Sequence, residues 1–145
     1  MPRRSEIKGV LRIIDANINR AKEGLRVCEE VTRFIACDRG VTSRFKAIRH
    51  KLDGFTAAYR RDPRLLDERE SRADVGRSIR SAGELRRDGW HDIFAANLQR
   101  VKESIRVLEE FSKLDDRRRA RGFKQLRYAV YELEKRASAL FTKGR

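Results

Sequence analysis

The sequence has few of the cysteines that cross-link small proteins and none of the long apolar runs that cross membranes. Only two cysteines, Cys28 and Cys37, occur among its 145 residues, too few for a disulfide framework. No apolar run approaches the roughly 20 residues of a membrane span, and no apolar leader follows the basic residues 1–4. We therefore expect a cytoplasmic protein with free thiols and no membrane partner, in which Cys28 is a small core residue.

Several catalytic signatures are also missing. The chain has no zinc-ligand spacing, no nucleophile elbow, no dinucleotide fingerprint and no Gly-x-x-x-x-Gly-Lys-Ser/Thr phosphate loop. No alternating pattern of useful length predicts a β-strand. These absences argue against the corresponding enzyme classes and leave an all-α fold as the expectation.

Positive charge is abundant. Lys and Arg outnumber Asp and Glu by 36 to 22, for a formal net charge of +14. Such a balance favours anionic partners, namely nucleic acid, acidic lipid or phosphorylated small molecules. Charges of both signs are mixed within each predicted helix and the few aromatic residues mostly follow apolar stripes, which makes nucleic acid the weaker choice.

An internal repeat organises the chain. Residues 16–30 and 96–110 are identical at nine of fifteen positions, including an Asn, two Arg and three Glu that core packing alone would not preserve. A second echo links Phe45-Lys-Ala-Ile-Arg-His50 with Phe123-Lys-Gln-Leu-Arg-Tyr128. The repeated unit is therefore a helix pair. It predicts a duplicated helical hairpin, packed as a pseudo-twofold four-helix bundle within one domain, residues 1–145.

Apolar spacing and breakers place the elements. Repeat one covers about 6–61, a long basic loop covers 62–89, and repeat two covers about 90–142. We expect the first helix (6–36) to end with Gly40 in a left-handed conformation, and Thr42 or Ser43 to cap the second helix. Asp62-Pro63 ends the second helix. The loop has one short helix near 81–87, the third helix starts near 88–92, and Asp115-Asp116 caps the fourth.

The repeated polar residues fall into two classes. Those farthest from the apolar stripe are expected to form solvated ion pairs along one helix: Arg26, Glu29, Glu30, Arg106, Glu109 and Glu110. Those at the edge of the stripe form a first polar set (Asn17, Arg20, Glu23) and a second polar set (Asn97, Arg100, Glu103). The two sets either line a cleft between the long helices or make a buried network that fixes helix register. Gly24 beside them predicts a close approach by a ligand or by another helix.

These residue types suit a phosphorylated ligand. Arginine forks bind phosphate oxygens, and a carboxylate can hold hydrated Mg²⁺. Arg49 with His50 and Arg127 with Tyr128 are candidates to extend the site, although His50 is equally a surface or core histidine, and Tyr128 and Tyr131 are most simply core residues. In the loop, residues 69–77 mix guanidinium, carboxylate and glycine, which is typical of a clamp over phosphates or of a solvated linker.

The motifs resemble a known family. They are Asp15-Ala-Asn-x-Asn-Arg-Ala-x-Glu-Gly-Leu-Arg-Val, Phe-Lys-x-x-Arg-His, Arg69 to Asp74-Val-Gly76, and Ala96-Asn-x-x-Arg-x-x-Glu-x-x-Arg-Val-Leu-Glu-Glu-Phe-x-Lys-Leu. This combination, spanning about 10–142, resembles the all-helical hydroxymethylpyrimidine phosphate kinases of thiamine biosynthesis, found alone or fused ahead of thiamine-phosphate synthase. The loop departs from the family pattern by carrying Glu70 where an Asp is usual.

The resemblance implies phosphorylation of hydroxymethylpyrimidine monophosphate to its diphosphate by ATP with Mg²⁺. It implies roles for the quoted residues. Arg20 and Arg100 bind phosphate, with Arg69 or Arg72 closing from the loop. Glu23, Glu103 and Asp74 hold Mg²⁺ or orient the attacking phosphate. Asn17 and Asn97 bind the aminopyrimidine or a ribose.

Other interpretations remain open at this point. The chain is alternatively a non-catalytic docking or regulatory module for thiamine-phosphate synthase, a basic helical nucleic-acid-binding protein, or a helical enzyme for some other anion. The sequence leaves the oligomeric state open, a homodimer included. It does not tell which half of the repeat binds ATP.

Overall fold

The computed structural model describes residues 1–143, and its regular elements there are all helical. α1 (Arg4–Glu30) continues through a π-helical turn (Val31–Ile35) and is followed by α2 (Arg39–Arg61) and the short α3 (Arg64–Asp67). After a long connection come α4 (Trp90–Ser112) and α5 (Arg117–Lys143). The all-α duplicated hairpin predicted from the repeat is confirmed.

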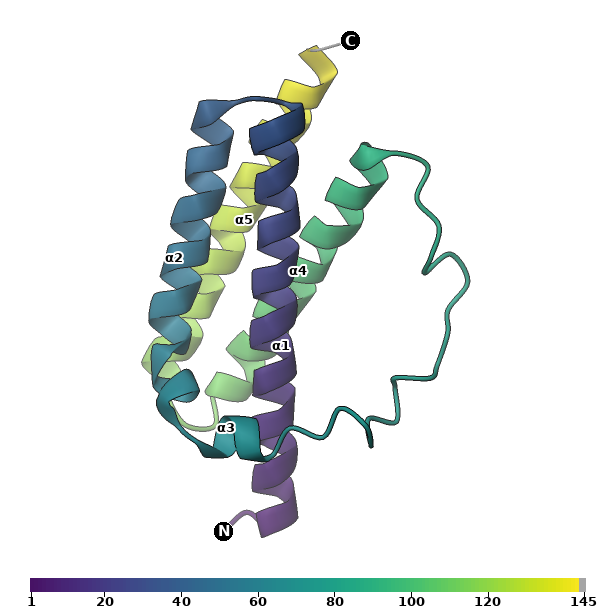
Figure 1. Cartoon of the computed structure of the whole chain (residues 1–145). Coiled ribbons are helices and arrows are strands. Elements are labelled where there is room, and N and C mark those ends of the chain that lie inside the picture. The colour runs from purple at the N-terminus through teal and green to yellow at the C-terminus, as the bar shows by residue number, and fades with distance from the viewer. Residues whose placement is uncertain (144–145) are drawn as a thin grey trace.

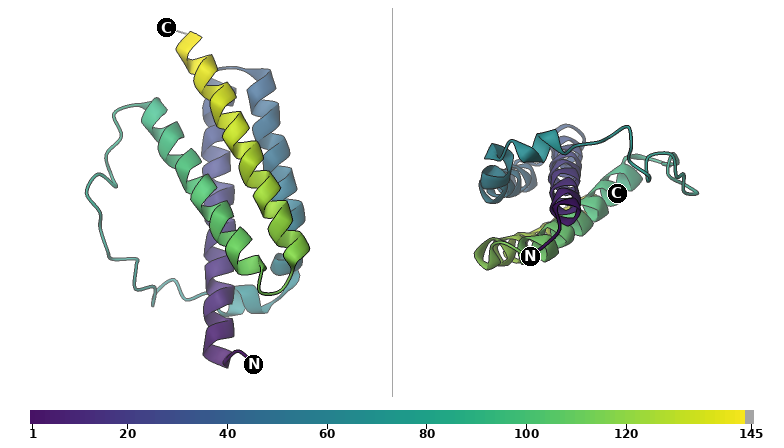
Figure 2. Two further views of the ribbon diagram at one scale, coloured as in Figure 1. Left: turned by 180° about the vertical axis from the view of Figure 1, so that it is seen from behind. Right: turned by 90° about the horizontal axis from the view of Figure 1, so that it is seen from below.

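The four long helices form one bundle (Figure 1). α1 packs against α4 and α2, and α5 packs against the same two helices. Each helix runs opposite to both of its neighbours, and the chain reaches α4 through a connection that returns along the outside of the bundle (Figures 1 and 2). No helix within residues 1–143 combines the length and the apolar character needed to cross a membrane.

The core is built from the repeated apolar stripes. Phe45 and its counterpart Phe123 are both fully buried, Phe45 edge-on to Phe94 and Phe123 tilted against Phe55. Cys28 is fully buried among them, as expected, and burial raises the pKa of its thiol to about 12. Two expected core residues are not in the core, because Tyr128 and Tyr131 lie on the outer side of α5 with 55% and 41% of their surface exposed.

Gly24 marks the point where α1 and α4 come closest. A Cβ atom at Gly24 would lie 2.8 Å from the carbonyl oxygen of Asn97 and 2.7 Å from Cγ2 of Val101. Of the two partners that the sequence allowed for this glycine, the structure shows the second helix. The two long helices are therefore in direct contact at this level, and no cleft separates them there.

The first hairpin turn differs from the prediction. The residue in the left-handed region is Cys37 (φ 52°), and Gly40 lies inside α2. Asp38 caps α2, since its Oδ1 accepts a hydrogen bond from the Val41 amide at 2.8 Å. The Thr42 hydroxyl instead donates to the hydroxyl of Thr32. The assignments of Gly40 and of the Thr42 or Ser43 cap were wrong because Asp38 provides an earlier acceptor for the free amides of the helix start.

The other boundaries follow the sequence more closely. α2 ends at Arg61, directly before Asp62-Pro63, as predicted. Asp116 caps α5, because its Oδ1 accepts hydrogen bonds from the amides of Arg118 and Arg119. The short helix expected near 81–87 is absent, and that stretch contains only turns. The short helix is α3, which docks through the buried Leu65.

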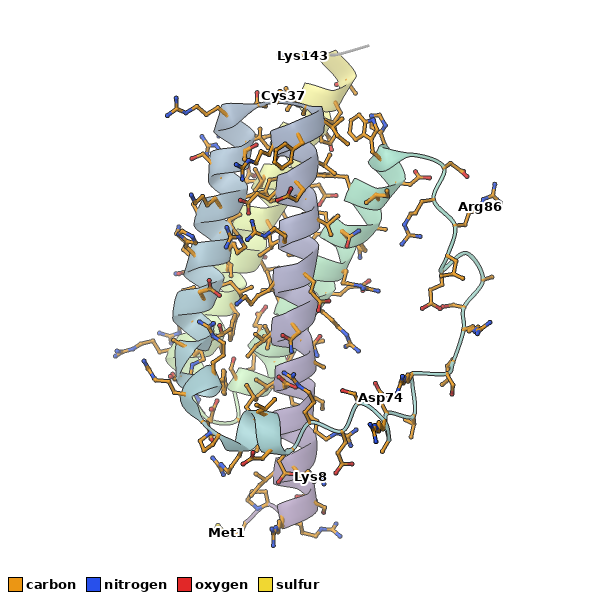
Figure 3. All side chains as sticks on the ribbon, in the orientation of Figure 1. Met1, Lys8, Cys37, Asp74, Arg86 and Lys143 are labelled. Atoms are coloured by element: carbon orange, nitrogen blue, oxygen red, sulfur yellow. The ribbon has the colours of Figure 1, made fainter. Side chains whose placement is uncertain are left out.

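Residues 68–89 form an extended segment that we call the arm. It leaves α3, passes α1, and then stands away from the bundle until it reaches α4 (Figures 1 and 2). Residues 71–89 are all exposed. Asp74 lies near the start of the arm and Arg86 far out on it, with 79% of the Arg86 side chain exposed (Figure 3). The predicted long basic loop is thus present, and only its first residues touch the helices.

Candidate functional site

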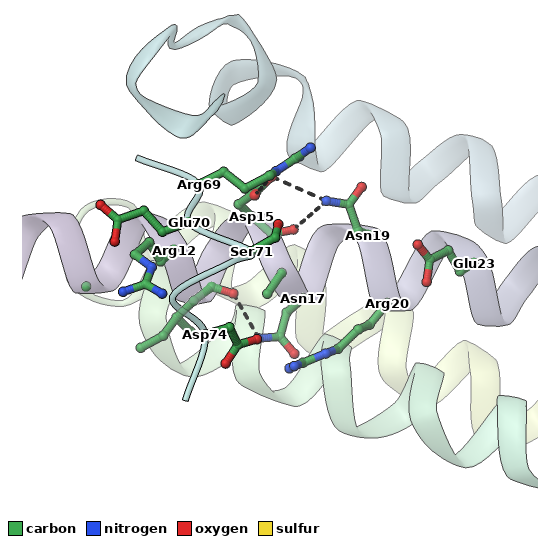
Figure 4. Close-up of a pocket in the computed structure, with 13 residues that line it drawn as sticks. Arg12, Asp15, Asn17, Asn19, Arg20, Glu23, Arg69, Glu70, Ser71 and Asp74 are labelled. Atoms are coloured by element: carbon green, nitrogen blue, oxygen red, sulfur yellow. Dashed lines mark hydrogen bonds and ion pairs between the residues drawn. The ribbon is translucent and has the colours of Figure 1, made fainter. Parts of the chain in front are cut away.

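A cleft of about 660 Å³ lies between α1 and the start of the arm. Its polar lining comes from both segments, with charged, amide and hydroxyl side chains facing one space (Figure 4). The residues that line it include Arg12, Asn17, Arg20, Glu23, Ser71 and Asp74. The sequence allowed a cleft between the two long helices, and the structure instead has this cleft between a helix and the arm.

A bidentate ion pair fixes the arm to α1. Arg69 donates from Nε to Oδ2 of Asp15 and from a terminal nitrogen to Oδ1, both at 2.7 Å. The Asp15 carboxylate is buried, and Asn19 donates to its Oδ1 at 3.3 Å. The hydrogen bonds that Arg69 donates to Asp15, followed by the charge of that carboxylate, raise the pKa of Arg69. Such a fork-to-fork pair is geometrically specific, and it occupies the guanidinium that the sequence assigned to a phosphate.

A second contact holds the same part of the arm. Lys8 Nζ lies 2.6 Å from Oε1 of Glu70 and 3.4 Å from Oε2 of Glu68. The hydrogen bond from Lys8, followed by its charge, lowers the pKa of Glu70. Glu70 is the loop residue at which the sequence departs from the family pattern, and it pairs with a lysine of α1.

Four charged groups of the cleft are left without such partners. Within residues 1–143, no ion pair is formed by Arg12 and Arg20 on α1, nor by Glu23 and Asp74. Asp74 instead accepts a hydrogen bond from the amide of Gly76 at 2.9 Å, which shapes the turn that brings it to the cleft. Two cations and two carboxylates thus remain available to a ligand.

The buried amide of Asn17 is oriented by its own helix. Asn17 Nδ2 donates to the carbonyl of Ile13 at 2.8 Å, and Asn97 Nδ2 donates to the carbonyl of Ile93 at the same distance. Both side-chain oxygens are therefore left to accept from a ligand or water. Neither of these amide hydrogen bonds crosses between helices, so they do not form a network that fixes helix register.

Metal binding would need a ligand's help. Among the described residues, no group of three or more His, Cys, Asp or Glu side chains is close enough to hold a metal ion. Mg²⁺ is usually held by one or two carboxylates together with phosphate oxygens and water. Glu23 and Asp74 are both exposed at the cleft, and Arg20 lies between them in Figure 4, so either one fits as the single carboxylate of such a set.

The second polar set is divided differently. Glu103 lies in a separate groove of about 520 Å³ on α4 and α5, with Lys102, Arg106, Arg127 and Tyr131. Arg100 and Asn97 line neither space. Because α1 and α4 are antiparallel and touch at Gly24 and Asn97, Arg20 and Arg100 lie at the same level along the pair. Both side chains are exposed there.

The basic residues on the supporting helices hold each hairpin together. Arg49 binds the buried Glu29 at 2.9 Å, and Arg127 binds the buried Glu109 at 2.9 Å. The predicted pairs of Arg26 and Arg106 along their own helices are formed. Glu29 and Glu109 are buried, however, and not solvated as their positions on the helices suggested. Neither Arg49 nor Arg127 borders the cleft on α1.

The remaining predicted residues lie outside the cleft. His50 is exposed on α2, and Arg72 is exposed on the arm just beyond Ser71. Sequence reasoning missed Arg12, Asp15, Asn19 and Ser71. A signal was present for two of them, because Arg12 corresponds to Asp92 in the second repeat and Asp15 to Ala95, so these positions break the repeat.

Comparison with known proteins gives consistent matches. A sequence model of the ThiD2 family matches residues 12–136. The chain is 39% identical over 147 residues to a thiamine-phosphate synthase of Rhodopirellula baltica, covering 97% of this chain and 38% of that relative. It is 42% identical over 125 residues to a thiamine-phosphate synthase of Synechocystis sp., covering 86% of this chain and 35% of that relative.

The chain spans less than two-fifths of the length of these curated relatives. No solved structure matches it significantly.

Proposed function

The chain belongs to the ThiD2 family, and on that premise we propose that it is a kinase of thiamine biosynthesis. The proposed reaction transfers the γ-phosphoryl group of ATP to hydroxymethylpyrimidine monophosphate, giving the diphosphate. The resemblance of the repeated motifs supports this reaction, and the names of the relatives support the pathway.

The observation that carries the proposal is the composition of the cleft beside the arm. Arg12 and Arg20 offer two guanidinium groups, and Glu23 and Asp74 offer two carboxylates, all without ion-pair partners in the described chain. Phosphoryl transfer needs little covalent help from the protein, because positioning and charge neutralisation provide most of the acceleration. The cleft has the groups for both tasks.

The chain's own residues divide these tasks. Arg20 binds phosphate oxygens of one substrate, and Arg100, at the same level of the neighbouring helix, binds those of the other. Glu23 or Asp74 would hold Mg²⁺ bound with ATP, which supplies further neutralisation of phosphate charge. The oxygen of Asn17 accepts a hydrogen bond from a ligand amine. The arm, fixed by Asp15, covers the cleft on one side and limits access of water.

A coupled assay of ADP release tests the proposal. Purified protein with Mg·ATP should turn over hydroxymethylpyrimidine monophosphate, while the unphosphorylated alcohol should be inert. Arg20→Ala and Arg100→Ala should each lower kcat/KM more than tenfold, because a hydrogen bond to a charged group contributes about 1.5–3 kcal/mol. Arg44→Ala, on the exposed face of α2, is the matched control and should stay within twofold.

Two results would contradict the proposal. One is wild-type turnover in both the Arg20 and Arg100 variants. The other is the absence of turnover from protein whose circular dichroism shows a folded helical bundle.

A second candidate function has one observation in its favour. The chain matches only 38% and 35% of two much longer proteins named thiamine-phosphate synthase. A segment of this kind also suits a docking or regulatory module for the synthase. Stable co-purification with a synthase, together with no ATP turnover, would favour this candidate over the kinase.

A further inference from the structure

The two halves of the α1/α4 pair differ in charge, although their backbones are related by the repeat. We infer that the polyphosphate of the nucleoside triphosphate binds in the repeat-one cleft, held by Arg12 and Arg20. This inference rests on the proposed function and deepens it, because it assigns one substrate to one half of a pseudo-symmetric protein. It also introduces Arg12 as a binding residue.

Ion pairs use some of the charged side chains at the cleft and leave two cations and two carboxylates unpaired. Arg69 is neutralised by Asp15 at 2.7 Å, and Glu70 by Lys8 at 2.6 Å. The cations that remain are Arg12 and Arg20, and the carboxylates that remain are Glu23 and Asp74. Two guanidinium groups suit a polyphosphate, and a carboxylate at the same cleft suits the Mg²⁺ that accompanies it. These four unpaired groups therefore fit a metal-bound polyphosphate better than a lone monophosphate.

The second repeat does not provide the same set. Arg12 is replaced there by Asp92, whose carboxylate accepts a hydrogen bond from the Asp88 amide at 3.0 Å. Asp15 is replaced by Ala95, so no equivalent anchor for an arm exists on α4. Of the two arginines, only Arg100 remains. This half suits the less highly charged substrate, the pyrimidine monophosphate.

The geometry of α1 brings the two arginines to one side. Arg12, Ala16 and Arg20 succeed one another at intervals of four residues, so they share a face, and the arginines are about 12 Å apart along the helix axis. The small side chain of Ala16 lies between them. Ser71 and Asp74 approach this interval from the arm (Figure 4). Gly9, at the end of the cleft, has no atom within 4 Å of an added Cβ, which leaves that end open.

Binding of inorganic tripolyphosphate with Mg²⁺, measured by calorimetry, tests the assignment. Tripolyphosphate carries the charge of the triphosphate chain but has no base or sugar, and its binding can be measured without the second substrate. Arg12→Gln should weaken its binding at least tenfold. Arg44→Gln, which removes the same charge from the exposed face of α2, should change the affinity less than twofold and controls for the general attraction of a +14 protein.

The outcomes separate this inference from the proposed function. Equal binding by Arg12→Gln and Arg44→Gln, or no binding of tripolyphosphate by the wild-type protein, would overturn the inference even if the kinase assay succeeds. Selective loss of binding in Arg12→Gln would support it. If the wild-type protein then shows no turnover, the kinase proposal fails while the anion site stands. Circular dichroism of each folded variant accompanies the measurement.

Discussion

Replacing Gly24 by alanine should destabilise the bundle, although alanine is the better helix former. The added Cβ would meet the Asn97 carbonyl oxygen at 2.8 Å and the Val101 methyl at 2.7 Å. The methyl group can move with its side chain. The carbonyl oxygen cannot move unless α4 moves too, because it belongs to the helix backbone. Overpacking of this kind typically costs about 1–3 kcal/mol.

A second glycine provides the matched control. Gly54 lies within α2 and has no atom within 4 Å of an added Cβ. Both alanine variants gain helix propensity of about 1 kcal/mol, so their difference isolates the contact with α4. We expect Gly54→Ala to unfold at higher urea than the wild type. The free energy of unfolding of Gly24→Ala should fall about 1–3 kcal/mol below that of Gly54→Ala.

Urea denaturation followed by circular dichroism measures both free energies, and an unchanged slope against urea shows that the two-state comparison holds. Equal stabilisation of the two variants would refute the close approach of α1 and α4 at Gly24. It would also remove the basis for placing Arg20 and Arg100 at the same level along the pair.

Two further predictions concern the arm and the thiols. Asp15→Asn should release Arg69 and speed tryptic cleavage after Arg69 and Arg72 several-fold, with the circular dichroism spectrum unchanged. Asp67→Asn, on exposed α3, should leave the cleavage rate unchanged. Equal digestion of both variants would contradict the anchoring of the arm by the ion pair between Asp15 and Arg69. At about pH 8.5, near the pKa of a free thiol, a thiol reagent should modify exposed Cys37 quickly and Cys28 only after unfolding. Burial raises the pKa of the Cys28 thiol to about 12, so the stability that comes from keeping this thiol protonated is complete below about pH 8.5 and is lost as the pH rises toward 12. Rapid reaction of both thiols would argue against the burial of Cys28.

The bundle itself could be predicted because the repeat preserves a helical period. Spacings of three and four place Ile18, Leu25 and their counterparts Leu98 and Ile105 on one face, and all four are buried. The sequence also predicted a close approach at Gly24. It could not choose between a ligand and a helix, because a missing side chain does not reveal what fills the space beside it.

The burial of Glu29 and Glu109 could not be predicted from one helix at a time. Their positions lie outside the apolar stripe, which indicated solvent. Each of α1 and α4 packs against two neighbours, however, so its buried sector is wider than its apolar stripe. The second neighbour brings Arg49 to Glu29 and Arg127 to Glu109, and a buried carboxylate needs such a partner.

The cleft depended on a contact that no periodic pattern records. Asp15 and Arg69 are 54 residues apart in the chain, and the arm has neither a hydrophobic period nor a cap that fixes its path. Arg69 was predicted to bind phosphate because of the mixed composition of the loop around it, and the structure pairs it with Asp15. Its partner was missed because Asp15 resembles any other acidic residue of a surface helix until the arm is seen to cross it.

The structure suggests how a symmetric frame can support an asymmetric reaction. Removing one partner of a buried ion pair costs about 3–5 kcal/mol, so Glu29 with Arg49 and Glu109 with Arg127 are tied to the fold in both repeats. Surface substitutions away from such pairs usually change stability by less than about 0.5 kcal/mol, so half-buried position 12 and exposed position 92 can differ with little cost to the bundle. The proposed phosphoryl transfer joins two unlike anions. The duplicated helices place Arg20 and Arg100 at equivalent positions. Because position 12 is Arg and its counterpart at 92 is Asp, the surroundings of Arg20 and Arg100 differ in charge.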